Sequence, residues 1–219
     1  MRIGIIGSSG GSVARELIGA ARSDHDFFIV TDRPCGLESL ADEFHLPWLR
    51  INESDNARFS LEAKQFFDQQ GCADFVLLFY LRLVTPELFA AYPTFNVHPS
   101  LLPDYRGFNA IERAHADRAE RFGATLHLID EHADTGPVVA QVSMNLRPGE
   151  TLENMRRISF AQKSYLVLYL LDQFESKKAN NWLQSLGYGP APVNPLLNSN
   201  AIREYFKKFT IREGLEGLL

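Results

Sequence analysis

The stretch "RIGIIGSSGGSVARELIGAAR" at residues 2–22 decides the fold of this 219-residue chain. It begins with a short β-branched run, continues through glycine and serine at 8–12, and ends with helical spacing at 13–22. This order predicts a buried strand, a glycine loop and a helix. Backbone N–H groups before a helix N-terminus favour an anion, although a plain tight turn would need the same glycines.

The following residues repeat the alternation of strand and helix. Apolar runs predict strands at 27–30, 74–79 and 95–97, and helical spacing predicts helices at 37–45, 57–71 and 85–92. Such alternation is typical of an α/β fold of the Rossmann-like, doubly wound kind, with a mostly parallel sheet. Two alternating runs at 124–130 and 137–144 look like antiparallel partners, which would make the sheet mixed.

The second half of the chain is predicted to be mainly helical around that hairpin. Helices are expected at 109–121, at 150–177 and at 201–209, with a loop-rich segment at 187–195. We therefore predict a catalytic domain at 1–180 and a C-terminal extension at 181–219 that is loop-rich with a short helix.

Composition excludes several classes of function. A net charge of −5, with no long run of Lys or Arg, argues against a general nucleic-acid binder. No apolar run approaches the roughly 18 residues that a membrane span needs. The apolar run in the first residues is also too short for a signal peptide. We therefore expect a cytoplasmic protein without a membrane partner, either a monomer or a homodimer.

Metal and disulfide chemistry are not expected. None of the six histidines falls in an HExxH arrangement, and no CxxC pair is present. Without an export signal, Cys35 and Cys72 are expected to be reduced.

Polar side chains alternate with apolar ones at the start of "FNVHPSLLPDYRG", residues 95–107, where a strand is predicted. Asn96 and His98 are two positions apart, so a strand would project both from the same face, while Pro99 ends the strand. An Asn amide and an imidazolium can both stabilise an oxygen that gains negative charge during acyl transfer. Asp134, on the loop "DEHADTGP" at 130–137, could keep the imidazole cationic and help proton transfer.

These residues resemble a known family, the folate-dependent formyltransferases, particularly the glycinamide ribonucleotide (phosphoribosylglycinamide) subgroup. The resemblance covers roughly residues 1–175. It is carried by "NVHPSLLPDYRG" (96–107), "DTGP" (134–137), "FYLRLVTPEL" (79–88), "GATLHLIDE" (123–131) and "SSGGS" (8–12).

The resemblance implies the formyltransferase fold, with 10-formyltetrahydrofolate as the formyl donor. It also implies that Asn96 and His98 polarise the formyl carbonyl and that Asp134 organises proton transfer. Ser100 and His127 match supporting positions. The positions matching the wall of the pterin pocket are Leu81, Arg82, Leu83, Val84, Ile129, Asp130 and Glu131.

The acceptor side departs from the subgroup's pattern. Val13 stands where the subgroup's glycine loop has an Asn, and Lys163 stands where a Glu usually touches the ribose. The segment 108–114 looks more like that of methionyl-tRNA formyltransferases, whose additional C-terminal domain finds no match here. Substrate contacts would then come from Gly10, Gly11, Ser12, Arg58 and Lys163.

Three hypotheses follow for function. The first is transfer of a formyl group to a primary amine, with phosphoribosylglycinamide in purine biosynthesis as the expected acceptor. The acceptor could instead be an amino sugar or a hydroxyornithine-like amine. The second is a non-catalytic Rossmann-type module that binds a nucleotide through residues 7–12 and Asp32. The third, ranked below both, is hydrolysis of the formyl folate by water.

Overall fold

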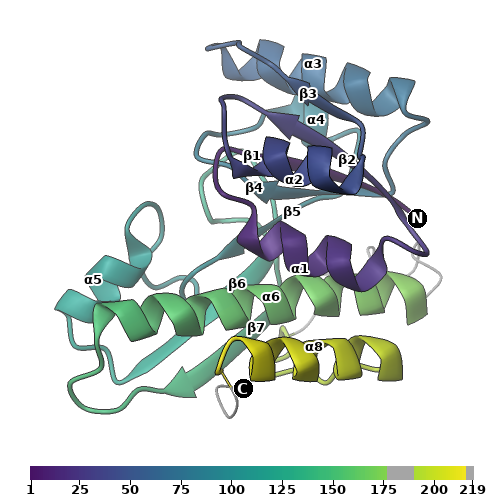
Figure 1. The fold of residues 1–219 in the computed structure, drawn as a ribbon. Coiled ribbons are helices and arrows are strands. Elements are labelled where there is room, and N and C mark those ends of the chain that lie inside the picture. Colours follow the sequence, from purple (N-terminus) through teal and green to yellow (C-terminus); the bar gives the residue numbers. More distant parts are fainter. Residues whose placement is uncertain (177–189, 216–219) are drawn as a thin grey trace. The chain divides into compact units, whose positions relative to one another are not determined.

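The computed structural model describes residues 1–176 and 190–215 of the chain (Figure 1). By their internal contacts the residues form two compact units, Met1–Asn96 with Leu128–Gly136 and Val97–His127 with Pro137–Leu219. The strands follow the order β3-β2-β1-β4-β5-β6-β7. The expected mixed α/β sheet is therefore confirmed, whereas the division into a catalytic domain and an extension stays a prediction.

The first unit is built on parallel strands. β1 pairs in register with β2 on one side and with β4 on the other, from Ile3 opposite Phe27 and Phe75 onward. β3 pairs with β2, and β5 pairs with β4. The strands are β1 (Arg2–Gly7), β2 (Asp26–Thr31), β3 (Trp48–Arg50), β4 (Phe75–Phe79) and β5 (Thr94–His98).

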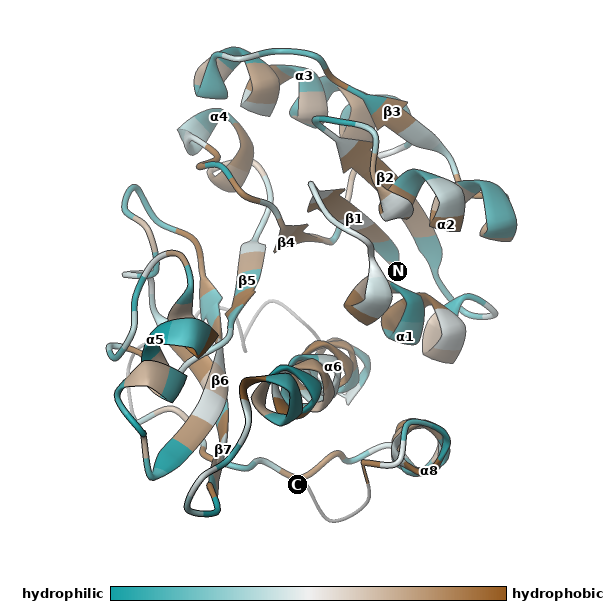
Figure 2. Cartoon of the chain, turned by 60° about the vertical axis from the view of Figure 1, so that its left-hand side comes forward, coloured by the Kyte–Doolittle hydropathy of each residue, from teal (hydrophilic) through white to brown (hydrophobic). Residues whose placement is uncertain are grey.

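Helices cover both faces of this parallel set, because its strands are apolar on both sides. Phe59 and Phe67 of α3 and Leu88 of α4 pack with Ile6 and Val76 on one face. α1 and α2 cover the other face, and the strands between them are mostly hydrophobic (Figures 1 and 2). The helices are α1 (Ser12–Ala21), α2 (Gly36–Phe44), α3 (Asn56–Gln69) and α4 (Pro86–Phe89).

The short edge strand β3 was not predicted from the sequence. It has only three residues, and a run that short carries no periodicity. Its Arg50 donates from Nε to Glu38 of α2 at 2.7 Å and forms a second, shorter bond from Nη2. Thr31 donates to the same carboxylate at 2.7 Å. A buried carboxylate therefore joins β2, β3 and α2.

We expect Glu38→Gln to lower the free energy of unfolding by about 1–2 kcal/mol at pH 7, because charged hydrogen bonds would be lost. Hydrogen bonds from Arg50 hold the pKa of Glu38 below its ordinary value. The stabilisation is therefore present above the unfolded-state pKa and disappears as the pH falls through the folded-state pKa. Urea unfolding of both proteins from pH 7 down to acid should show the difference shrinking. A difference that stays constant with pH would contradict this interpretation.

The second unit is built on the antiparallel hairpin of β6 and β7, as predicted. Arg121 pairs with Asn145, and the register continues to a bulge between Leu126 and His127. The long helix α6 packs on the hairpin and on α5, and its residues 166–174 are all buried. The elements are β6 (Arg121–Leu128), β7 (Val138–Asn145), α5 (Ala110–Ala116), α6 (Leu152–Ser176) and α8 (Asn200–Arg212).

Residues 192–194 hydrogen-bond to the outer edge of β7. Gln141 accepts from the Asn194 amide and donates its own to Pro192, and Asn194 also pairs its side chain with Ser143. Such an edge would otherwise present unpaired backbone groups for association. The buried Asp172 of α6 accepts from the amides of Asn198 and Ser199, which fixes the entry to α8.

Two helices are much shorter than predicted. The helix expected at 109–121 ends at Ala116, because the next strand already begins at Arg121. The helix expected at 85–92 is a single turn, Pro86–Phe89, and Thr85 makes no side-chain cap because its hydroxyl donates to Glu87. Part of the loop predicted at 187–195 lies outside the described residues.

No helix in the described ranges is long and apolar enough to cross a membrane. Among the same residues, no group of three or more His, Cys, Asp and Glu side chains could hold a metal ion. Cys35 and Cys72 are both free thiols, the second of them exposed.

Candidate functional site

The carboxyl end of β5 carries the first two candidate catalytic residues. Asn96 pairs with Leu78 of the neighbouring β4 and is partly buried, and His98 is 5 % exposed. The alternation of a strand projects both side chains from one face, while Phe95 and Val97 are buried on the other. The strand ends at His98, immediately before Pro99, as the sequence indicated.

Asp134 lies beside Asn96 in the first unit, although 38 residues separate them in the chain. The Asn96 amide nitrogen donates to an Asp134 carboxylate oxygen at 3.5 Å, a long hydrogen bond. The amide of Ile129 donates to the carbonyl of Thr94 at 2.9 Å, so the loop that carries Asp134 starts next to β5. This contact brings together two of the three predicted catalytic residues.

The Asp134 loop is held by its own residues. The Asp130 carboxylate accepts from the His132 amide at 3.1 Å and from the Thr135 hydroxyl at 2.7 Å. Asp134 has a left-handed backbone with φ 57°. Of the predicted pterin contacts, Ile129 packs against the apolar core of the first unit and Glu131 is exposed. Asp130 therefore shapes the loop through its side chain.

In the second unit, His98 is fixed by the loop that follows it. Its Nε2 lies 2.9 Å from the carbonyl oxygen of Tyr105. The predicted supporting residue Ser100 is 1 % exposed, and its hydroxyl donates to the Asp104 carbonyl at 2.5 Å. Thr125 of β6 donates to the Ser100 carbonyl at 2.7 Å and accepts from the Leu102 amide. Hydrogen bonds within the turn and from β6 therefore hold the turn after His98 in place.

His127, the other supporting residue, is 1 % exposed at the bulge in β6. Its side chain therefore lies in the interior of the hairpin.

The segment after β4 offers exposed apolar side chains. Leu81 and Leu83 are 50 % and 49 % exposed, whereas Val84 is 5 % exposed and belongs to the core. Arg82 donates to the carbonyls of Glu53 and Ser54 at 2.6 and 2.5 Å. Its guanidinium is therefore used to hold this segment, and the two leucines remain as the apolar surface that a flat ring would cover.

The glycine loop ends at the N-terminus of α1. Gly11 is the N-cap, with φ 77°, and it provides no capping side chain for the N–H groups of the first turn. Gly10 and Ser12 are exposed. Val13 is 5 % exposed and packs inward, so it offers a ligand nothing in place of an Asn side chain.

The carboxylate of Asp32 accepts hydrogen bonds from a neighbouring side chain. Arg33 donates to the Asp32 carboxylate from two nitrogens, at 3.1 and 2.7 Å, and the Asp32 side chain is 3 % exposed. Burial opposes ionisation, but hydrogen bonds from Arg33 and Ser8 outweigh it and lower the pKa of Asp32. A carboxylate held in this way is poorly placed to bind a ribose, which weakens the nucleotide-binding alternative.

The two cations proposed for the acceptor lie on separate helices. Arg58, in the first turn of α3, is exposed, and its backbone amide donates to the N-cap Asp55. Lys163 of α6 is half-buried, and burial lowers the pKa of its ammonium group. No ion pair of Lys163 is formed with any residue that the structure describes.

Three polar residues of α6 close to Lys163 in the sequence were not predicted as site residues. Ser159, Gln162 and Ser164 are fully buried, and their side-chain polar atoms have no hydrogen-bond partner among the described residues. Buried polar groups in this state usually bind an ordered water or a ligand. No signal in the sequence distinguishes them from ordinary helix residues.

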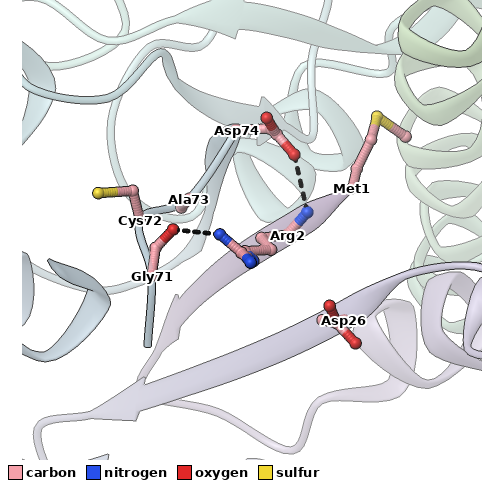
Figure 3. A pocket seen from close by; sticks show the side chains of 7 residues that line it. All are labelled: Met1, Arg2, Asp26, Gly71, Cys72, Ala73 and Asp74. Carbon is pink, nitrogen blue, oxygen red and sulfur yellow. Dashed lines mark hydrogen bonds between the residues drawn. The ribbon is translucent and has the colours of Figure 1, made fainter. Parts of the chain in front are cut away.

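A small surface hollow lies at the opposite, amino end of β1 and β2 (Figure 3). Arg2 spans it, donating from its amide to Asp74 at 2.8 Å and from its guanidinium to the Gly71 carbonyl at 2.5 Å. Because none of the predicted site residues lines the hollow, it is not a candidate site.

Known proteins resemble this chain in sequence and in structure. Phosphoribosylglycinamide formyltransferase of Mycobacterium tuberculosis is 29 % identical over 177 residues, which cover 76 % of this chain and 81 % of that protein. Methionyl-tRNA formyltransferase of Thermotoga neapolitana is 25 % identical over 80 % of this chain and 55 % of that protein.

The crystal structure of phosphoribosylglycinamide formyltransferase from Bacillus halodurans superimposes with a TM-score of 0.76 at 29 % identity. That alignment covers 84 % of this chain and all of the other. The family model described as formyl transferase matches residues 1–170, a range that includes the glycine loop, Asn96, His98, Asp134 and Lys163. The chain belongs to the formyl transferase family.

Proposed function

We propose that this enzyme transfers a formyl group from 10-formyltetrahydrofolate to the amine of phosphoribosylglycinamide, and that Asn96, His98 and Asp134 carry the reaction. Family membership assigns formyl transfer as the reaction class. The observation that carries the residue assignment is the contact of Asn96 with Asp134, because it joins two distant segments at the end of β5.

The proposed chemistry is direct transfer. The acceptor nitrogen attacks the formyl carbon, and the bond from that carbon to N10 of the folate then breaks. The net proton movement is from the attacking nitrogen to N10. Asn96 and His98 stabilise the oxygen of the tetrahedral intermediate, and Asp134 helps the proton leave the amine. Alignment of the two substrates supplies much of the remaining acceleration.

The donor and acceptor would bind to different surfaces. The exposed Leu81 and Leu83 supply the apolar wall that a pterin ring requires, with the backbone of 129–131 reading its edge. The uncapped first turn of α1 suits an acceptor phosphate.

A different amine is the second candidate for the acceptor, and Val13 and Lys163 favour it. The buried Val13 offers no side-chain donor, and a half-buried ammonium group without an ion pair among the described residues calls for an anionic ligand. An acceptor with a carboxylate or a second phosphate would meet that requirement.

Mass spectrometry of reactions between a 10-formyl folate and a panel of amines tests the proposal. Phosphoribosylglycinamide should be converted into its N-formyl derivative with one deformylated folate per product. Formylation of another amine alone would reject the purine-pathway acceptor and keep the reaction. Release of free formate with no formylated amine would reject transfer in favour of hydrolysis.

A further inference from the structure

The carbonyl of Tyr105 is shared by two donors in the second unit. His98 Nε2 lies 2.9 Å from this oxygen, and Nη2 of Arg113 donates to it at 2.7 Å. The same guanidinium also donates to the carbonyl of Arg106. A carbonyl oxygen has two lone pairs, so these two donors saturate that of Tyr105.

This contact fixes the protonation of the imidazole ring. A carbonyl oxygen can only accept, so the ring nitrogen that faces it must carry a proton. The Nε2–H bond is therefore present in both the neutral and the charged ring of His98. Nδ1 is then the nitrogen at which the ring can exchange a proton, because the backbone carbonyl of Tyr105 holds the proton on Nε2.

The carbonyl needs support because of the backbone around it. Tyr105 has φ 53°, in the left-handed region that a residue other than glycine occupies at a cost. Such a conformation persists only where surrounding contacts determine it. The guanidinium carbon of Arg113 lies 5.9 Å from the centre of the Tyr105 ring, and Nη2 of the same residue bonds the Tyr105 carbonyl, so α5 contacts both the side chain and the backbone of this residue.

We infer that Arg113 is a positioning residue for His98: through the carbonyl of Tyr105 it keeps the imidazole oriented with its proton on Nε2 and leaves Nδ1 to exchange a proton during formyl transfer. The catalytic consequence rests on the role proposed for His98. The orientation of the ring does not, and it can be measured in the absence of any substrate.

The first test is NMR of the full chain with ¹⁵N-labelled histidine. A ring N–H that is hydrogen-bonded and shielded from water gives a visible proton signal, which the loss of one signal in His98→Ala assigns to His98. We expect this signal in the wild type and in Arg113→Lys, which keeps one charged donor. In Arg113→Gln the signal should disappear through exchange with water. Arg118→Gln, an exposed arginine just beyond α5, is the matched control and should leave it unchanged.

The second test is steady-state kinetics of the same proteins. Arg113→Gln should reduce kcat about tenfold and leave KM for the formyl folate unchanged, because misorientation affects the transition state rather than donor binding. Arg113→Lys should recover most of the loss. A folded Arg113→Gln protein that keeps the His98 ring signal would overturn the inference. If the wild type formylated no amine, the proposed function would fail while the NMR result still decided this inference.

Discussion

His98→Ala is expected to lower kcat for formyl transfer about 10³-fold, because the variant removes both an oxyanion donor and a proton-transfer group. Donor binding should hardly change, since the proposed pterin surface lies in other segments, at 81–84 and 129–131. Rapid-quench measurement of formylated amine gives the rate. Titration with a non-transferable 10-formyl folate analogue gives the affinity.

Two further variants make this test specific. His115→Ala removes a partly buried histidine of α5 that has no proposed role, and it should retain wild-type activity. The double variant His98→Ala/Asp134→Ala should be scarcely slower than His98→Ala alone, because residues that act as a unit have non-additive effects. If the two losses multiplied instead, His98 and Asp134 would act independently and the shared role proposed here would be wrong.

Most of the fold could be predicted because its signals are local. β1, β2 and β4 are short apolar runs bounded by loops, and the helix after the glycine loop follows from spacing alone. The edge strand β3 was not predicted, because three residues are too few to show a periodic pattern. It is held by its pairing with β2 and by the hydrogen bond from Arg50 to Glu38 of α2. Tertiary contacts decided that element, and periodicity could not show them.

The candidate site was predictable only in part, for a related reason. The common face of Asn96 and His98 follows from strand geometry, and their meaning followed from a family resemblance. The occupation of Asp32 by Arg33 and the support of His98 by Tyr105 depend on where side chains and backbone groups turn. Every residue has a backbone carbonyl, so no sequence motif could have revealed the contact of His98 with the carbonyl of Tyr105.

Gly136→Ala is expected to lower the free energy of unfolding by about 3 kcal/mol, at the upper end of what overpacking costs. A Cβ atom at this position would lie 1.9 Å from the Leu128 carbonyl oxygen and 2.9 Å from its carbonyl carbon. Both are backbone atoms, so no side-chain rotation can relieve the collision. For a chain of this size, the expected loss corresponds to a fall in Tm of roughly 6–12 °C.

The same collision should also lower the rate of formyl transfer, because Gly136 and Leu128 are the two ends of the loop that carries Asp134. Forcing those ends apart moves the carboxylate away from the Asn96 amide, and a displacement of about 1 Å can cost 10²-fold in rate. Gly10→Ala is the control for stability, since a Cβ there meets nothing within 4 Å. The activities of Gly136→Ala and the wild type should be compared at a temperature where circular dichroism shows that both are folded. A Gly136→Ala protein as stable and as active as the wild type would mean that the backbone of this loop adapts to a side chain, and that Asp134 does not depend on the close approach described here.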